Sequence, residues 1–223
     1  MFHTLLKFQE KLATLPVLTV LICGYFLFPL LLLPQILPAP YKPLDLMPFY
    51  TPEIAYTILN SYDLAAKVSY INGSQSIDTL YPVYYATLFG LILSFYLVRL
   101  YSDKHPAQVI RLLPYAAMAF DLIENFAIIS MLQNLPEQNM SLAWLAASMT
   151  LLKWVVIVTC ILCCAGFAIK FYRVQDTETS TRPHNGAKPK TPLTILKPGQ
   201  RDIPKLSFAG HRHPISNTSC SSH

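Results

Sequence analysis

Four long runs of apolar residues stand out along the chain, separated by shorter mixed segments. They cover residues 15–33, 81–100, 112–132 and 142–171. The hydrocarbon core of a bilayer is about 30 Å thick, and an α-helix needs about 20 residues to cross it. Each run is therefore predicted to be a membrane-spanning helix. The predicted fold class is an all-α membrane protein with a four-transmembrane-helix bundle.

The segment between the first two runs is too long to be a simple connection. Thr51-Pro52-Glu53 has the features of a helix start: a hydroxyl cap, a proline in the first turn and an early acidic residue. Apolar residues then recur at helical spacing at Ala55, Ile58, Leu59, Tyr62 and Ala65. We predict an amphipathic helix over residues 52–70 in this extracytoplasmic loop, ending before Asn72-Gly73.

The end of the chain has a different composition from the rest. Residues 173–223 contain no sustained apolar run and are rich in Ser, Thr, Pro, Lys and His. Such a segment cannot bury enough apolar surface to offset the entropy lost on ordering. We expect a transmembrane domain over 1–172 and a disordered cytoplasmic tail over 173–223, whose basic residues would attract anionic lipid.

Composition narrows the class of protein further. Hydrophobic residues make up 53% of the chain and charged residues only 13%, whereas a soluble domain usually has about 25% charged residues. A purely soluble protein is excluded. The net charge of +5 is not concentrated in a basic patch or a recognised motif, so nucleic acid is not an expected partner.

Lysine and arginine are distributed unevenly between the two sides of the four-span arrangement. Of 17 basic residues, all but Lys42, Lys67 and Lys153 lie before the first run, from the end of the second run to the start of the third, or from the end of the fourth onward. Cytoplasmic loops carry the excess of such residues. We therefore predict a multi-pass protein with both termini in the cytoplasm; the sequence does not indicate which membrane holds it.

The third and fourth runs carry polar residues at the depth where water is scarcest. Asp121, Glu124 and Asn125 lie in the third, while Thr150 and Lys153 lie in the fourth. Ionisable groups inside a bilayer need partners. At about 1.5 Å per residue, Asp121 and Lys153 are about 15 Å and 18 Å from opposite boundaries, which places both near the midplane.

Helical spacing also puts these residues on facing stripes of small or polar side chains, which suit close packing. We expect Lys153 to meet Asp121 or Glu124 in the bundle interior. One acid would remain in excess and could carry a proton. A structural lock and a proton-handling device both fit this pattern.

A second polar group stands at the predicted outer end of the second span. It consists of Asp78, Tyr81, Tyr84 and Tyr85. Interfacial tyrosines usually form the aromatic belt, although these could also contact a substrate. The six histidines lie in the termini, tail and inner loop, so we expect no metal site, and no motif indicates a cofactor.

Four motifs together resemble a known pattern. They are Tyr50-Thr51-Pro52-Glu53-x-Ala55-Tyr56, Asp78 with Tyr81-Pro82-x-Tyr84, Asp121-Leu-Ile-Glu124-Asn125, and Thr150-Leu-Leu-Lys153-Trp154. Over about residues 15–172 the chain resembles an uncharacterised family of small four-span integral membrane proteins common in bacteria. The resemblance implies the architecture but no activity, and the tail departs from the compact bacterial form.

Three functions remain open from the sequence. The first is a structural or interaction component of a membrane assembly, partnered by another membrane protein or by a second copy. The second is a small proton-linked transporter, and the third a membrane enzyme acting on a lipid or quinone through Asp121, Glu124 and Lys153. Broken helices and an internal repeat, typical of carriers, are missing, and no second polar constellation indicates an enzyme. The first function is favoured.

Overall fold

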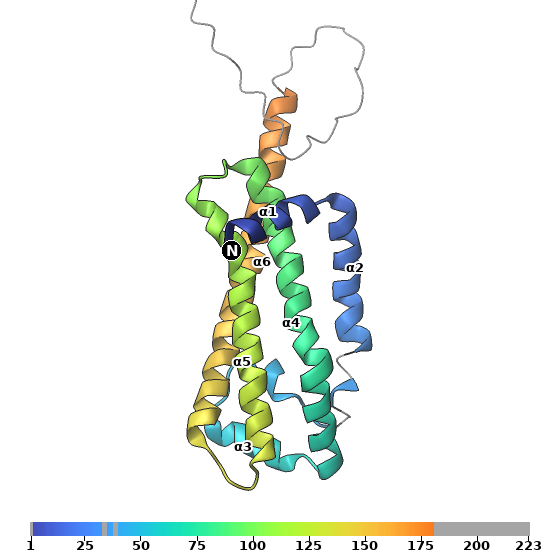
Figure 1. The fold of residues 1–223 in the computed structure, drawn as a ribbon, viewed down its shortest axis with the longest axis vertical. Coiled ribbons are helices and arrows are strands. Elements are labelled where there is room, and N and C mark those ends of the chain that lie inside the picture. Colours follow the sequence, from blue (N-terminus) through green and yellow to red (C-terminus); the bar gives the residue numbers. More distant parts are fainter. Residues whose placement is uncertain (1, 33–34, 38–39, 181–223) are drawn as a thin grey trace, which may run out of the picture. The chain divides into compact units, whose positions relative to one another are not determined.

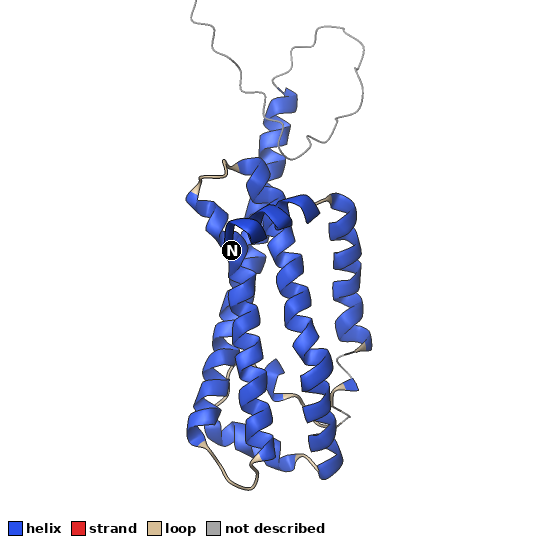
Figure 2. Ribbon diagram, in the orientation of Figure 1, coloured by secondary structure: helices blue, strands red, loops and turns tan. Residues whose placement is uncertain are grey.

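The computed structural model describes residues 2–32, 35–37 and 40–180. Within these residues every regular element is helical, which confirms the all-α class (Figure 2). Three helices are long and apolar enough to cross a membrane: Leu64–Leu100, Pro106–Gln133 and Met140–Thr177. The chain therefore has the helices of a membrane protein.

The three long helices follow one another along the chain and pack against each other. They are α4 (Leu64–Leu100), α5 (Leu113–Gln133, preceded by the 3₁₀ helix η3, Pro106–Leu112) and α6 (Met140–Ser180). Each contacts the other two, and α5 and α6 have the most extensive contact (Figure 1). The connection between α5 and α6 is short, so the two helices run antiparallel as neighbours.

The amino-terminal part forms two helices at a sharp angle. Helix α1 (Phe2–Leu12) crosses one end of the bundle, and α2 (Leu15–Leu31) packs along α4 (Figure 1). The predicted first span, residues 15–33, corresponds to α2, which has 17 residues. The segments Leu6–Leu12 and Leu15–Phe28 qualify as one further span only when taken together, and they are bent by 92°.

The outer loop differs from the prediction. It contains the 3₁₀ helix η2 (Leu44–Leu46) and α3 (Pro52–Ser61), which crosses the end of the bundle opposite α1 (Figure 1). Helix α3 starts where predicted, and Thr51 accepts a hydrogen bond from the backbone of Ile54. The predicted extent to residue 70 was wrong, because the Asp63 side chain caps a new helix that begins at Leu64.

Asn72-Gly73 does not end a helix but lies inside α4. The glycine serves close packing instead, since a Cβ there would lie 2.8 Å from the Ile36 backbone. The missing side chain lets the start of the outer loop lie against α4. The second predicted span, residues 81–100, is thus only the later part of a continuous helix of 37 residues.

The last helix also runs beyond its predicted limit. Helix α6 continues to Ser180, so the expectation of a disordered segment from residue 173 was wrong for residues 173–180. The rest of the predicted tail, residues 181–223, lies outside the described residues.

Candidate functional site

Lys153 on α6 is the centre of a buried polar network. Its Nζ lies 3.2 Å from Asp121 Oδ1 and 2.6 Å from Glu124 Oε2, both on α5. It also donates to the backbone carbonyl of Asp45, at 3.3 Å. Glu124 is fully buried, and Asp121 and Lys153 are each 5% exposed. One ammonium therefore joins two carboxylates and the outer loop.

The helical stripes explain why these residues meet. On α5, the stripe of residues at helical spacing in the third apolar run is buried along its whole length. It consists of Pro114, Ala117, Asp121, Glu124, Asn125 and Ile128. On α6 the residues Ala146, Thr150 and Cys160 of the facing stripe are also buried. The alanines permit close approach of the two backbones, so the charged groups between them lie in reach of each other.

A chain of hydroxyl groups continues the network toward the outer loop. Thr150 Oγ1 lies 2.6 Å from Glu124 Oε1 and 2.9 Å from the hydroxyl of Tyr50. Burial raises the pKa of Tyr50 well above its usual value, so this hydroxyl keeps its proton and can donate to Thr150. The Thr150 hydroxyl in turn donates to Glu124, and the order is Tyr50 to Thr150 to Glu124.

The side chains of Asp121 and Asp45 each accept a hydrogen bond from a tyrosine of α4. Tyr85 on α4 donates to Asp121 Oδ2 at 3.0 Å, and Tyr70, also on α4, donates to Asp45 Oδ1 at the same distance. Both tyrosines are buried. Helix α4 therefore contributes to the network together with α5 and α6. Asp45 of η2 is bonded to both α4 and α6.

Asn125, next to Glu124, does not bond Lys153 but bonds the backbone of α4. Pro82 lies inside α4 and has no N–H, so the carbonyl of Asp78 loses its helical donor. The side-chain amide nitrogen of Asn125 lies 3.4 Å from that carbonyl oxygen and donates to it. Asn125 thus compensates the proline in a buried stretch of α4, where an unpaired carbonyl would be unfavourable.

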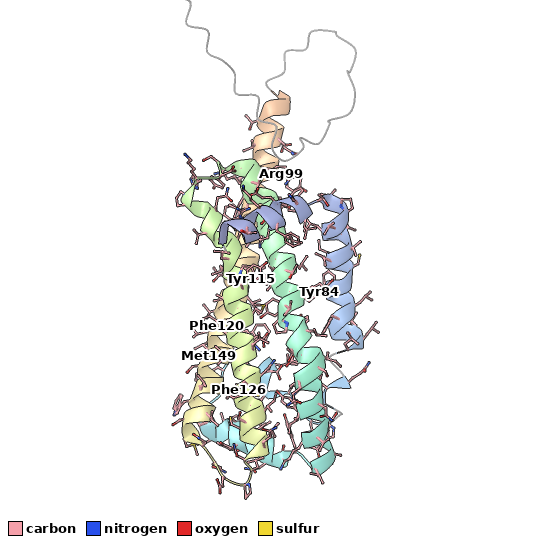
Figure 3. All side chains as sticks on the ribbon, in the orientation of Figure 1. Tyr84, Arg99, Tyr115, Phe120, Phe126 and Met149 are labelled. Carbon is pink, nitrogen blue, oxygen red and sulfur yellow. The ribbon has the colours of Figure 1, made fainter. Side chains whose placement is uncertain are left out.

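The expected outer-interface group is placed elsewhere. Because α4 begins at Leu64, Tyr81, Tyr84 and Tyr85 lie in the middle of the helix rather than at its outer end. Tyr84 donates to the Leu21 carbonyl of α2 at 2.7 Å (Figure 3). Tyr81 stacks against Phe28, with ring centroids 4.9 Å apart. These two tyrosines hold α2 against α4, while Tyr85 belongs to the network.

Sequence reasoning missed the residues that the loop and α4 contribute. Asp45, Tyr50 and Tyr70 are separated from Lys153 by more than 80 positions, and no local pattern pairs them with it. Tyr50 gave one signal, because it opens the first of the four motifs. A second missed cluster joins α1 to the bundle: buried Gln9 donates to Tyr115 at 3.0 Å.

The chemistry of the network is that of an acid-rich, enclosed site. Electrostatic interactions couple Lys153 to Asp121, Glu124, Asp45 and Asp78. Two of these four carboxyl groups, those of Asp121 and Glu124, contact the ammonium group directly. Among the residues that the structure describes, no cluster of three or more His, Cys, Asp or Glu side chains could hold a metal ion.

Comparison of the chain with known protein families, with curated proteins and with solved structures finds no match. The resemblance carried by the four motifs therefore stays a prediction, and the geometry above is the basis for assigning a function.

Proposed function

We propose that this chain is a four-span membrane protein with cytoplasmic termini that acts as a structural, interacting component of a membrane assembly. One observation carries the proposal: Lys153 of α6 contacts Asp121 and Glu124 of α5 and the Asp45 carbonyl of the outer loop. Buried polar groups of this kind can fix one helix register among the many that apolar packing would allow. The network would therefore set the arrangement of the bundle.

The outer face of α6 supports an interaction role. In its most apolar stretch only 11% of α6 is buried within the described chain, against 44% for α4. Large apolar side chains are spread over this free surface, among them Trp144, Leu151, Val155 and Leu162. Lipid, another membrane protein or a second copy of the chain would cover it.

The first test replaces Lys153→Met. Removing one partner of a buried pair typically lowers the free energy of unfolding by about 3–5 kcal/mol, because the remaining charges stay buried. We expect a loss of this size in detergent, measured by denaturant unfolding. The matched control is Lys170→Met on the same helix. Lys170 is exposed and donates to the Tyr101 hydroxyl, so the expected change is at most about 1 kcal/mol.

A neutral network separates folding from function. The triple variant Lys153→Met, Asp121→Asn, Glu124→Gln removes the charges together, so most of the lost stability should return. On the proposed role, the folded triple variant still co-purifies with its membrane partner, or self-associates, in the same stoichiometry as the wild type. A wild-type protein that is monomeric and without a stoichiometric partner after gentle extraction contradicts the proposal.

The excess of acid over base favours one second candidate, a proton-linked transporter. Two carboxylates contact a single ammonium, and the Tyr50–Thr150–Glu124 chain connects the site to the outer loop. For a transporter, the folded triple variant would lose proton-coupled uptake in reconstituted vesicles. Proton movement absent from wild-type vesicles argues against this candidate.

A further inference from the structure

A groove lies on the exposed face of α6, near the end of the bundle that α1 crosses. Helix α6 projects past the other helices at this end (Figure 1). Lys170, in the groove, is about 25 Å from Lys153 along the helix axis, so the groove is separate from the buried network. The described residues that line it recur at intervals of three and four: Gly166, Ile169, Lys170, Arg173, Val174 and Thr177.

The groove carries positive charge that no neighbouring acid neutralises. Lys170 and Arg173 are the charged residues of its described lining, and neither forms an ion pair with a described residue. Arg111, at the same end of the bundle, is by contrast paired with Glu10. Two adjacent cations without a counterion favour an anionic ligand with oxygen acceptors, such as a phosphate group.

Lys170 is held in position by the residue that follows α4. Its Nζ donates to the Tyr101 hydroxyl at 2.9 Å and lies 4.5 Å from the centre of that ring. A hydroxyl group orients the ammonium group without cancelling its charge, and two of the three N–H donors remain for a ligand. A cation that is already oriented loses less side-chain entropy on binding than a free one.

The two cations lie at the level of lipid headgroups if α6 crosses the bilayer. From Met140 to Lys170 the helix is about 45 Å long, which is the thickness of a bilayer with both headgroup regions. The contact with Tyr101 places Lys170 where α4 also ends. An anion bound here would therefore be at the membrane surface rather than in the hydrocarbon core.

Toward the membrane, the same face of α6 is apolar. Val155, Leu162 and Ile169 recur every seven residues, about two turns, and each is more than half exposed. We call these three residues the apolar stripe. Beside it Gly166 leaves a hollow, because nothing lies within 4 Å of a Cβ built there. The stripe is about 21 Å long, against about 15 Å for one half of the hydrocarbon core, so an acyl chain can lie along it.

This order of charge and apolar surface matches one class of membrane molecule. We propose that the groove binds an anionic phospholipid, with its phosphate at Lys170 and Arg173 and one acyl chain along the apolar stripe. A soluble anion would use the cations but not the stripe. A zwitterionic lipid brings its own cation, which weakens its attraction to the two side chains. The proposal requires that α6 crosses the bilayer, but not that the chain joins an assembly.

The test measures lipid binding to the purified full chain in an uncharged detergent by native mass spectrometry. The probes are dioleoylphosphatidylglycerol, which has a net negative charge, and dioleoylphosphatidylcholine, which has the same acyl chains and no net charge. We expect saturable binding of one phosphatidylglycerol molecule, at least tenfold tighter than phosphatidylcholine. Free glycerol 3-phosphate, an anion without acyl chains, should bind at least tenfold more weakly than phosphatidylglycerol.

Substitutions in the groove locate the site. Lys170→Gln and Arg173→Gln are each expected to weaken phosphatidylglycerol binding about fivefold, and the double variant about thirtyfold, as for basic residues near an anionic membrane surface. Phosphatidylcholine binding should change less than about twofold. Both side chains are exposed, so the unfolding midpoint should remain close to that of the wild type.

Two further double variants remove the same amount of charge elsewhere. Lys7→Gln with Lys11→Gln changes two exposed lysines of α1, at the same end of the bundle. Lys188→Gln with Lys190→Gln changes two lysines of the predicted tail, outside the described residues. Each control should keep its affinity for phosphatidylglycerol within about twofold of the wild type, because neither touches the groove.

Three outcomes would overturn the proposal. Equal affinity for phosphatidylglycerol and phosphatidylcholine removes the role of the two cations. Equal affinity for glycerol 3-phosphate removes the role of the apolar stripe and leaves a site for soluble phosphate esters. Equal losses in the three double variants show a general attraction of basic residues to anionic lipid, without a site in this groove. None of these outcomes depends on the Lys153 network or on a membrane partner.

Discussion

At the scale of single residues, the role of each polar side chain depends on the number of hydrogen bonds it can complete. Thr150 has one hydroxyl hydrogen and two acceptors in reach, Glu124 Oε1 at 2.6 Å and the Ala146 carbonyl at 2.8 Å. Tyr50 keeps its proton because burial raises the pKa of its hydroxyl. If the Tyr50 hydroxyl donates to Thr150, the hydroxyl hydrogen of Thr150 is free to be donated to Glu124. Tyr50, Thr150 and Glu124 then each have a hydrogen-bond partner.

Thr150→Val tests this order of donors. Valine keeps the shape of threonine but removes the donor to Glu124 and the acceptor for Tyr50. A buried polar group that loses its partner typically reduces stability by about 1–3 kcal/mol, and a carboxylate lies toward the upper end. We expect a decrease of this size in the free energy of unfolding in detergent.

The control for this variant is Thr159→Val, two and a half turns along the same helix. Thr159 is exposed, and its hydroxyl bonds the Val155 carbonyl of its own helix. The side chains lost are the same, so helix propensity and volume cancel in the comparison. Equal losses in the two variants would show that the Thr150–Glu124 contact contributes nothing.

At the scale of helices, glycines decide how closely neighbouring segments approach. A Cβ on Gly73 would lie 2.7 Å from Ile36 Cγ2 and 2.8 Å from its Cα, distances that real Cβ atoms do not reach. At Gly166, on α6, nothing lies within 4 Å of the added atom. Two helical glycines of the same chain thus differ only in whether a neighbouring segment packs on them.

This difference predicts opposite results for two alanine substitutions. Overpacking by one methyl group typically reduces stability by about 1–3 kcal/mol, whereas alanine in an open helix position is more favourable than glycine by about 0.5–1 kcal/mol. We expect Gly73→Ala to lower the unfolding midpoint and Gly166→Ala to leave it unchanged or raise it. Stabilisation by Gly73→Ala would mean that the outer loop does not lie against α4.

The same glycine shows where local sequence reasoning fails. Asn72-Gly73 has the composition of a helix end, and the sequence predicts a break there. Capping by Asp63 and packing against Ile36 override that local signal, so α4 runs through it. By contrast, three of the four apolar runs lie within helices that are long and apolar enough to cross a membrane, because the need to bury or shield apolar side chains acts on whole segments of about 20 residues.

The part of the candidate site that lies on α5 and α6 was predictable, because the helical spacing of polar residues determines which side chains face each other. Facing stripes of two adjacent helices were enough to bring Lys153 toward Asp121 and Glu124. The contributions of Asp45, Tyr50 and Tyr70 depend on how a long loop folds back into the bundle. The contacts of Asp45 and Tyr50 with α6 span 100 or more residues, that of Tyr70 with Asp45 spans 25, and none of them leaves a period in the sequence.

At the scale of the whole described chain, charge separates the two ends of the bundle. The end crossed by α1 holds Arg99 (Figure 3) and an ion pair of 3.1 Å between Arg111 and Glu10. Lys170 donates to Tyr101 at this end as well. The opposite end, with α3 and the α5–α6 connection, carries few basic residues. By the positive-inside rule, the proposed topology would place the first end in the cytoplasm.

Single cysteines at the two ends test that assignment. In a variant whose five natural cysteines are replaced by alanine, Ser102→Cys lies between α4 and α5 and Gln138→Cys between α5 and α6. Both positions are exposed. With a membrane-impermeant maleimide on sealed membranes of known orientation, we expect labelling of Gln138→Cys from the non-cytoplasmic side, and labelling of Ser102→Cys only from the cytoplasmic side.

The result distinguishes the possible topologies because the two positions flank one helix. If α5 spans the bilayer, they must lie on opposite sides, whatever the path of α1 and α2. Labelling of both from outside contradicts a span at α5, and a reversed pattern contradicts the charge argument. Adding a cysteine at Thr4, before the bend of 92°, completes the test. With α2 as a span, that position behaves like Ser102→Cys; otherwise it behaves like Gln138→Cys.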